Sequence, residues 1–183
     1  MGPLLRDRRD ARRKELLDAA YERFMQYGYA KTTFDDIAQK AGVSRTLLYA
    51  YFEDKKELFR CVARDVLDGQ RLKTEAVLES KQTDEEKLVA ILELWSVELY
   101  ARIADKPHGG ELLEEGYRAW EKIGVHYMST LVRALAPLAG GPEVAELLVL
   151  CLGGLQQDRP AVAAVRKRVR LLARLARRAK GLS

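Results

Sequence analysis

Residues 32–55 read TTFDDIAQKAGVSRTLLYAYFEDK, a pattern that predicts two short helices meeting at a tight corner. Thr33 is a hydroxyl N-cap for the first helix, and Asp36 follows three residues later, at the spacing of a capping box. Apolar residues then recur at helical intervals, namely Phe34, Ile37, Ala38 and Ala41. Gly42 can end this helix, because glycine enters left-handed backbone conformations without a steric penalty from Cβ.

The second helix of the corner is predicted to begin after Ser44, a favourable N-cap residue. Leu48 and Phe52 lie four residues apart and face inward, so the other side chains of this helix face outward. A glycine turn followed by a helix with guanidinium, hydroxyl and phenol groups on its outer face is typical of a DNA-reading helix-turn-helix. The residues predicted to bind DNA are Thr33, Ser44, Arg45, Thr46, Tyr49, Tyr51 and Lys55.

Within this set, Arg45 and Thr46 are expected to read base edges, because the first turn of a recognition helix enters the major groove most deeply. Tyr49, Tyr51 and Lys55 are expected to hold phosphate oxygens. The alternative is a purely structural corner, since similar corners occur in helical proteins that do not bind nucleic acid. The two outward-facing tyrosines, which the apolar pattern does not require, favour DNA binding.

The same region resembles the N-terminal domain of the TetR family of transcriptional repressors. The resemblance extends from about Lys14 to Leu58 and is carried by GYAKTT at 28–33, IA at 37–38, AGVS at 41–44, LYAYF at 48–52 and Lys55. It implies a helical regulatory domain that senses a small molecule and forms a dimer. The chain departs from the family at Thr46-Leu47, where Gly-Thr is frequent. It also departs at Asp35, where a neutral or basic residue would suit phosphate better.

The charge distribution indicates which parts of the chain could approach a polyanion. The 183 residues carry a net charge of +5, divided as +3 over residues 1–60, −7 over 61–158 and +9 over 159–183. A polyanion is therefore not expected to touch the acidic middle. The basic N-terminal segment, from Arg6 to Lys14, is interpreted either as a solvated helix start or as a DNA-contacting arm.

Compartment and membrane association are predicted from the cysteines and the apolar runs. Cys61 and Cys151 are far apart and lie among apolar neighbours, as expected for buried free thiols in a reducing cytoplasm. No secretory signal is visible at the N-terminus. The longest apolar run, Leu147 to Leu155, is far shorter than the ~20 residues that span a bilayer. We therefore expect a cytoplasmic protein that does not enter a membrane.

Beyond the corner, helical periodicity dominates and no strand pattern is found. Helices are predicted over residues 6–27, 55–80, 84–104, from 111 to a break at Pro137, 143–157 and 161–180. The predicted fold is therefore all-α with about nine helices. Residues 1–54 form the expected three-helix DNA-binding domain, and residues 55–183 the regulatory, ligand-binding and dimerisation domain.

Catalysis, a metal site and a cofactor are not expected. His108 and His126 have no nucleophile or further ligand at a motif spacing, and the catalytic signatures GxSxG and HExxH are absent. A ligand pocket is more plausible, because large side chains with polar tips gather in the middle third. The candidates are Trp95, Tyr100, Tyr117, Trp120, His126 and Tyr127. The alternative for each of them is ordinary core packing.

The segment 143–157 is apolar on nearly every side, more than one core needs, so a dimer interface is expected there. Together with the last helix it would form a four-helix bundle across a two-fold axis, using Leu147, Leu148, Leu152, Leu155, Val162, Val165 and Val169. The alternative is that this segment is the central core helix of a monomer.

We therefore expect a transcriptional regulator, most simply a repressor that a small apolar or aromatic ligand releases from a palindromic operator in double-stranded DNA. The alternative is a helical module that binds a protein or a membrane surface without specific DNA recognition. An enzyme is not expected.

Overall fold

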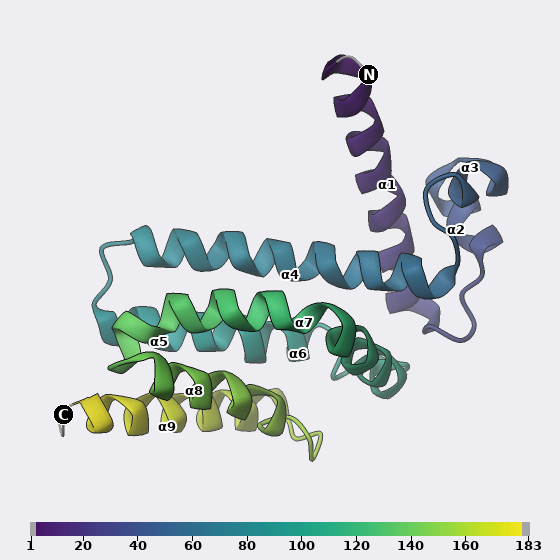
Figure 1. The fold of residues 1–183 in the computed structure, drawn as a ribbon. Helices are drawn as coiled ribbons and strands as arrows, with labels where there is room; N and C mark the ends of the chain where they lie inside the picture. Colours follow the sequence, from purple (N-terminus) through teal and green to yellow (C-terminus); the bar gives the residue numbers. More distant parts are fainter. Residues whose placement is uncertain (1–2, 181–183) are drawn as a thin grey trace. The chain divides into compact units, whose positions relative to one another are not determined.

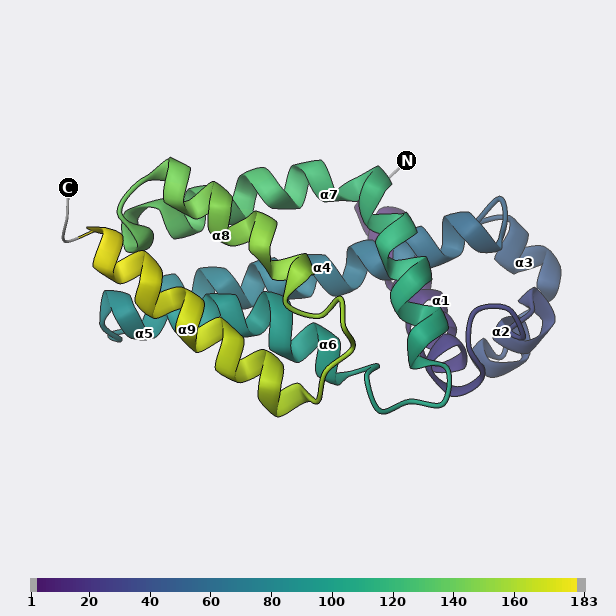
Figure 2. The same cartoon turned by 90° about the horizontal axis from the view of Figure 1, so that it is seen from below.

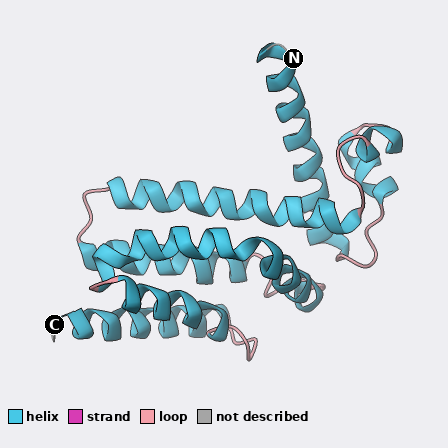
Figure 3. Cartoon of the chain, viewed as in Figure 1, coloured by secondary structure: helices cyan, strands magenta, loops and turns pink. Residues whose placement is uncertain are grey.

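The computed structural model describes residues 3–180, with side chains from residue 7 to residue 178. Within this range the chain forms helices joined by short connections and contains no strand (Figure 3), so the all-α prediction is confirmed. The helices are α1 (Pro3–Tyr27), α2 (Phe34–Ala41), α3 (Arg45–Tyr49), α4 (Lys55–Glu79), α5 (Asp84–Leu92), α6 (Leu99–Ala101), α7 (Gly109–Ala139), α8 (Pro142–Gly154) and α9 (Val162–Lys180) (Figure 1). None of these described helices combines the length and the apolar character needed to cross a bilayer.

The predicted corner forms as its local chemistry requires. Thr33 Oγ1 accepts a hydrogen bond from the Asp36 amide, and the Asp36 carboxylate accepts one from the Thr33 amide, which completes the capping box. Gly42 ends α2 in the left-handed conformation, with φ 65°. Ser44 Oγ then accepts from the Leu47 amide at 3.1 Å and caps α3. The corner is fixed by hydrogen bonds between near neighbours in the chain, which explains why it could be predicted.

Two features of the middle of the chain differ from the prediction. The expected single helix over 84–104 contains a π-helical segment, Glu93–Glu98, between α5 and α6. Within this segment the Leu94 carbonyl accepts a hydrogen bond from Gln70 Nε2 of α4 at 2.6 Å. Counted as continuous helices, the described residues form eight against the nine or so expected. Pro137 does not stop α7, which reaches Ala139, because one missing amide near a helix end removes only one backbone bond.

The chain divides into two compact units, each with its own core. The first contains the chain up to Val66 together with Lys106–Ile123. It therefore includes the predicted DNA-binding domain and, in addition, the starts of α4 and α7. In its core α1 packs against α2 and α2 against α3, while Phe24 of α1 contacts Phe59 of α4. The fully buried side chains include Leu16, Phe24, Ile37, Leu48, Phe52 and Leu58.

The second unit contains Leu67–Asp105 and the chain from Gly124 onward. In this unit α9 lies beside α5, the π segment and α8 (Figure 2). Its fully buried side chains include Leu88, Ile91, Leu92, Leu131, Leu135, Val165 and Val169. The helices α4 and α7 each begin in the first unit and continue into the second.

Candidate nucleic-acid interface

The outer face of α3 presents the predicted base-reading residues. Leu48 is fully buried beneath this face, whereas Ser44, Arg45, Thr46 and Tyr49 are exposed. The Tyr49 ring lies on Phe34 of α2, with ring centroids 4.7 Å apart. This contact holds the phenol against the supporting helix, so α2 and α3 present one continuous surface.

Arg45 is held by two neighbours on this surface. Its Nη1 donates to Asp35 Oδ2 at 2.9 Å, and its Nη2 donates to the Tyr49 hydroxyl at 3.3 Å. The guanidinium also lies 5.5 Å from the centroid of the Tyr49 ring. The hydrogen bond to Tyr49 and the charge of Asp35 raise the pKa of Arg45 above its ordinary value. Asp35 thus contacts the residue that we expect to read bases, a partnership that the sequence pattern did not indicate.

The two cap hydroxyls in the predicted set already have partners inside the chain. Thr33 Oγ1 donates to Asp36 Oδ2 at 2.6 Å, and these bonds from Thr33 lower the pKa of the Asp36 carboxyl. Ser44 Oγ accepts from the Leu47 amide. Both residues remain exposed at the N-termini of their helices. In the structure each hydroxyl caps a helix, and its direct contact with DNA stays a prediction.

Lys55 lies in a different setting from the one we expected. Its ammonium donates to the carbonyl oxygens of Tyr29, Ala30 and Thr32, at 3.0, 3.2 and 3.1 Å, and lies 4.5 Å from the centroid of the Tyr29 ring. A lysine ammonium has three N–H donors, and three carbonyls occupy them here. In the structure Lys55 therefore anchors the α1–α2 connection, and its contact with phosphate stays a prediction.

The same connection is also held from α7. Glu111 accepts a hydrogen bond from the Ala30 amide. Gly28, at φ 81°, lies so close to Glu111 and His108 that a Cβ at this position would collide with both side chains. Thr32 is fully buried and donates to the Gly28 carbonyl at 2.6 Å. Sequence reasoning missed Glu111 and His108, because they follow the connection by about eighty residues and belong to no local motif.

Tyr51 differs from Tyr49 in its surroundings. It is half-buried, and the Arg9 guanidinium of α1 lies 5.8 Å from the centroid of its ring. Arg9 therefore joins the candidate interface from the basic start of α1. This start is helical in the structure, since α1 begins at Pro3.

The predicted pocket residues fall into both compact units. Tyr117 and Trp120 belong to the first unit, while the other four belong to the second. Among those four, the Trp95 and Tyr127 rings lie 6.2 Å apart, and the exposed His126 ring lies 5.4 Å from Tyr127. A single site that uses all six residues is therefore not supported by contacts within either unit.

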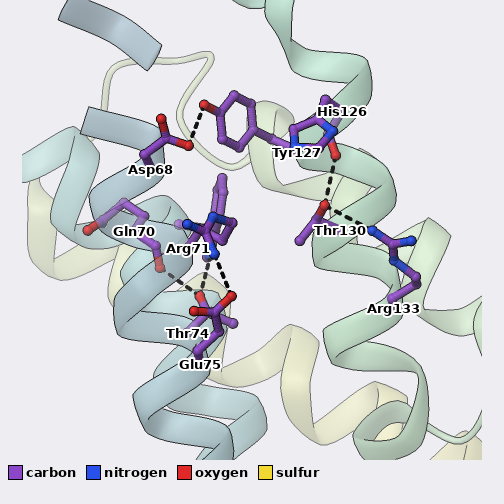
Figure 4. Close-up of polar contacts among 10 residues, drawn as sticks. Asp68, Gln70, Arg71, Thr74, Glu75, His126, Tyr127, Thr130 and Arg133 are labelled. Carbon is purple, nitrogen blue, oxygen red and sulfur yellow. Dashed lines mark hydrogen bonds and ion pairs between the residues drawn. The ribbon is translucent and has the colours of Figure 1, made fainter. Parts of the chain in front are cut away.

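Polar atoms surround the Trp95–Tyr127 pair. Trp95 Nε1 donates to Thr74 Oγ1 at 2.8 Å, and the Tyr127 hydroxyl donates to Asp68 at 2.9 Å. Figure 4 shows Tyr127 reaching from α7 to Asp68 on α4, with Gln70 and Thr74 on the following turns. Tyr100 is buried, as Trp95 and Tyr127 are, and donates to the Pro160 carbonyl at 2.7 Å. Trp95 and Tyr127 are the two predicted pocket residues whose buried rings lie beside each other, and we keep this pair as the candidate for a ligand-sensing region.

The predicted dimer residues separate into buried and exposed groups. Leu148, Leu152, Val165 and Val169 are buried within one chain, between 0% and 7% exposed. Leu155 and Val162 are half-buried, while Leu147 is 63% exposed. Periodicity could not distinguish the two faces of an all-apolar helix. Among the residues that the structure describes, the large apolar side chains that α8 and α9 expose are Leu147, Leu150, Leu171 and Leu175. Cys151 of α8, which we expected to be buried, is exposed as well.

Comparison with known proteins agrees with this reading of the corner. Residues 16–62 match the family model described as bacterial regulatory proteins, tetR family. Over 58 residues the chain is 43% identical to the HTH-type transcriptional regulator RutR from Escherichia coli strain K12, covering 32% of this chain and 27% of RutR. Over 85 residues it is 36% identical to the HTH-type transcriptional activator FasR from Mycolicibacterium smegmatis, covering 46% of this chain and 39% of FasR.

The match to these curated relatives thus spans between about a quarter and two fifths of their length. Likeness in fold extends much further. A TetR transcription regulator from Haloarcula marismortui superposes with a TM-score of 0.72, covering 91% of this chain and 98% of that one at 17% sequence identity. The predicted resemblance is confirmed, by sequence over the helix-turn-helix and by fold over most of the chain.

The role of Lys55 as an anchor of the α1–α2 connection gives a first prediction. Lys55→Met keeps the aliphatic stem but leaves three carbonyl oxygens without their donor, so the free energy of unfolding should fall by about 1–2 kcal/mol. Urea denaturation measures this change. Lys56→Met, at the exposed neighbouring position, is the matched control and should change stability by less than about 0.5 kcal/mol.

The opposite pattern of results would show that Lys55 contacts phosphate, as the sequence predicts. If Lys55→Met folds with unchanged stability but flattens the salt dependence of DNA binding by about one unit per subunit, Lys55 neutralises a phosphate.

Proposed function

We propose that this chain, whose N-terminal segment has the sequence and fold of the TetR family, is a transcriptional regulator that binds a specific palindromic operator as a homodimer. The observation that carries the proposal is the exposed α3 surface, where Arg45 lies in the first turn of a capped second helix. An exposed arginine at that place can donate two hydrogen bonds to the O6 and N7 atoms of a guanine.

Sequence-specific binding is the central test of this proposal. A gel shift with DNA flanking the gene should show retention that unlabelled operator removes and unrelated DNA does not. Arg45→Ala should lower the affinity for the operator by about tenfold or more while changing the affinity for unrelated DNA far less, because a bidentate base contact supplies that discrimination. If affinity falls equally for all sequences, Arg45 contacts phosphate and the base-reading role is wrong.

Dimerisation is proposed to use the exposed faces of α8 and α9. Leu147 and Leu150 on α8 are 63% and 65% exposed, so both apolar side chains face solvent in a single chain and would gain free energy from burial against a partner. The α8 face also exposes Glu143 and Glu146, whereas α9 exposes Lys167 and Arg174. These opposite charges favour an arrangement in which α8 of one subunit packs against α9 of the other.

Leu150→Glu tests this surface. Each leucine buried at an interface contributes about 1.5–3 kcal/mol, and the substitution occurs once in each of the two subunits. The dissociation constant of the dimer should therefore rise at least about a hundredfold. Sedimentation at micromolar concentration should then give a species near 20.7 kDa in place of one about twice as heavy. Leu72→Glu, at a 56% exposed leucine of α4, is the matched control and should remain dimeric. Dimers of Leu150→Glu as stable as the wild type would reject this interface.

Regulation by a small apolar or aromatic ligand is proposed for the region around Trp95 and Tyr127. Two helices that contact or border this region also hold the DNA-binding end: α4 through Lys55 and α7 through Glu111, both bonded to the α1–α2 connection. A ligand can release DNA only if it binds the two conformations unequally. Displacement of either helix changes the anchor of α2, which gives such a ligand a route to the DNA-reading surface.

The coupling is tested with a Trp120→Phe background, in which Trp95 is the remaining tryptophan. A compound that quenches Trp95 fluorescence should weaken operator binding by roughly 5- to 150-fold, the usual range of allosteric coupling. Adding Glu111→Gln should reduce that factor while leaving the quenching intact. A tightly bound quenching compound that leaves DNA affinity unchanged would reject the coupling.

Repression is the direction of control that we propose, following the family resemblance. One of the relatives, FasR, is named as an activator, so the resemblance is compatible with either direction. A reporter gene placed behind the operator determines the sign: expression should rise when the protein is deleted, and a fall would assign activation. We expect the protein to act in the cytoplasm, where the DNA is.

A further inference from the structure

Asp35 occupies a position where its negative charge opposes DNA binding, and the capping of α2 does not require it. The capping box of α2 is completed by Thr33 and Asp36. Phe34 and Ile37 on either side of Asp35 turn toward the core, while Asp35 is 64% exposed. A carboxylate on the DNA-facing surface repels phosphate, since affinity for DNA comes largely from cationic groups that displace counterions.

The remaining interaction of Asp35 is its ion pair with Arg45, which lies ten residues further along the chain. The pair is open to solvent on both sides, with Arg45 55% exposed, and such surface pairs contribute little to folding stability. Asp35 also lies in the first turn of α2, where a carboxylate interacts favourably with the helix dipole and stabilises the helix slightly. Beyond these small contributions to stability, the ion pair fixes the position of the guanidinium, which donates to Asp35 from Nη1 and to Tyr49 from Nη2.

The donor count of Arg45 allows this arrangement to coexist with base reading. A guanidinium has five N–H donors, and the contacts to Asp35 and Tyr49 use two of them. Three donors remain, and a bidentate contact to guanine needs two. Arg45 can therefore keep both intramolecular partners while it meets a guanine edge.

We propose that Asp35 is a specificity-determining positioning residue, which orients Arg45 toward guanine and weakens binding wherever Arg45 finds another base. Two effects combine. Orientation strengthens the contact with guanine, because the arginine loses less rotamer freedom when it binds. Repulsion between the Asp35 carboxylate and phosphate lowers the affinity for every sequence, so only sites with the compensating guanine contact are retained. This inference rests on the proposed function.

The experiment uses the full-length dimer and an operator first selected with the wild-type protein from a pool of random DNA duplexes. Affinities are then measured for the operator and for all single-base variants of its half-site, with wild type, Asp35→Asn, Arg45→Ala and the double variant. Asp35→Asn should bind unrelated DNA more tightly and lose about tenfold in preference at the base position that Arg45→Ala also affects. In the Arg45→Ala background it should change no base preference.

Glu22→Gln provides the matched control. Glu22 pairs with Lys40 at 2.5 Å in the same compact unit, so this variant removes one surface carboxylate and one ion pair without touching Arg45. It should leave every base preference unchanged.

Three results would overturn the inference. Asp35→Asn could change affinity by the same factor for all sequences, which reduces Asp35 to a general charge. It could alter a base position that Arg45→Ala does not affect, which makes Asp35 a direct reader of a base such as cytosine. It could keep its effect on base preference in the Arg45→Ala background, which shows that Asp35 acts without Arg45. If the wild-type protein selects no operator at all, the proposed function fails, and this result is separate from the other three.

Discussion

The Lys55 ammonium, surrounded by three backbone carbonyls of the α1–α2 connection, is the constraint on which the DNA-reading end depends. The connection leaves α1 at Gly28 and contains the carbonyl groups of Tyr29, Ala30 and Thr32. A cation at the first residue of α4 satisfies all three at once. Because unpaired carbonyls in a partly buried loop are costly, the start of α4 fixes where the connection lies and hence where α2 begins.

This anchor also explains why α4 and α7 together form a plausible control element. Glu111 accepts a hydrogen bond from the Ala30 amide, and Lys55 donates one to the Ala30 carbonyl. One short segment is therefore held by opposite charges on two helices. Both helices continue into the compact unit that contains Trp95 and Tyr127. The residues that hold the α1–α2 connection therefore belong to the same continuous helices as the residues around the expected ligand site.

The sequence was sufficient wherever structure is set by neighbours in the chain. The Thr33–Asp36 box, the left-handed Gly42 and the Ser44 cap are short-range features, and they form as predicted. Sequence reasoning could not find contacts that a distant partner decides. Lys55 has the residue type of a phosphate contact, and nothing in the sequence indicated that its ammonium donates to the carbonyls of Tyr29, Ala30 and Thr32. Leu148 and Leu147 are chemically identical neighbours on an apolar helix, and only packing against other helices determines which one is buried.

The π segment at Glu93–Glu98 has a further meaning for how this protein can change. A π turn contains one residue more than an α turn, so it takes up an added residue within one turn, and the helix that follows keeps its facing. Tyr100 lies just after this segment and donates to Pro160 in its present register. Deletion of one residue within 93–98 would therefore return this turn to ordinary winding while Tyr100 still faces Pro160. The change would be confined to the side chains of the turn itself, Trp95 among them, so the loss of a single codon alters the region around Trp95 while the caps and core on either side keep their sequence.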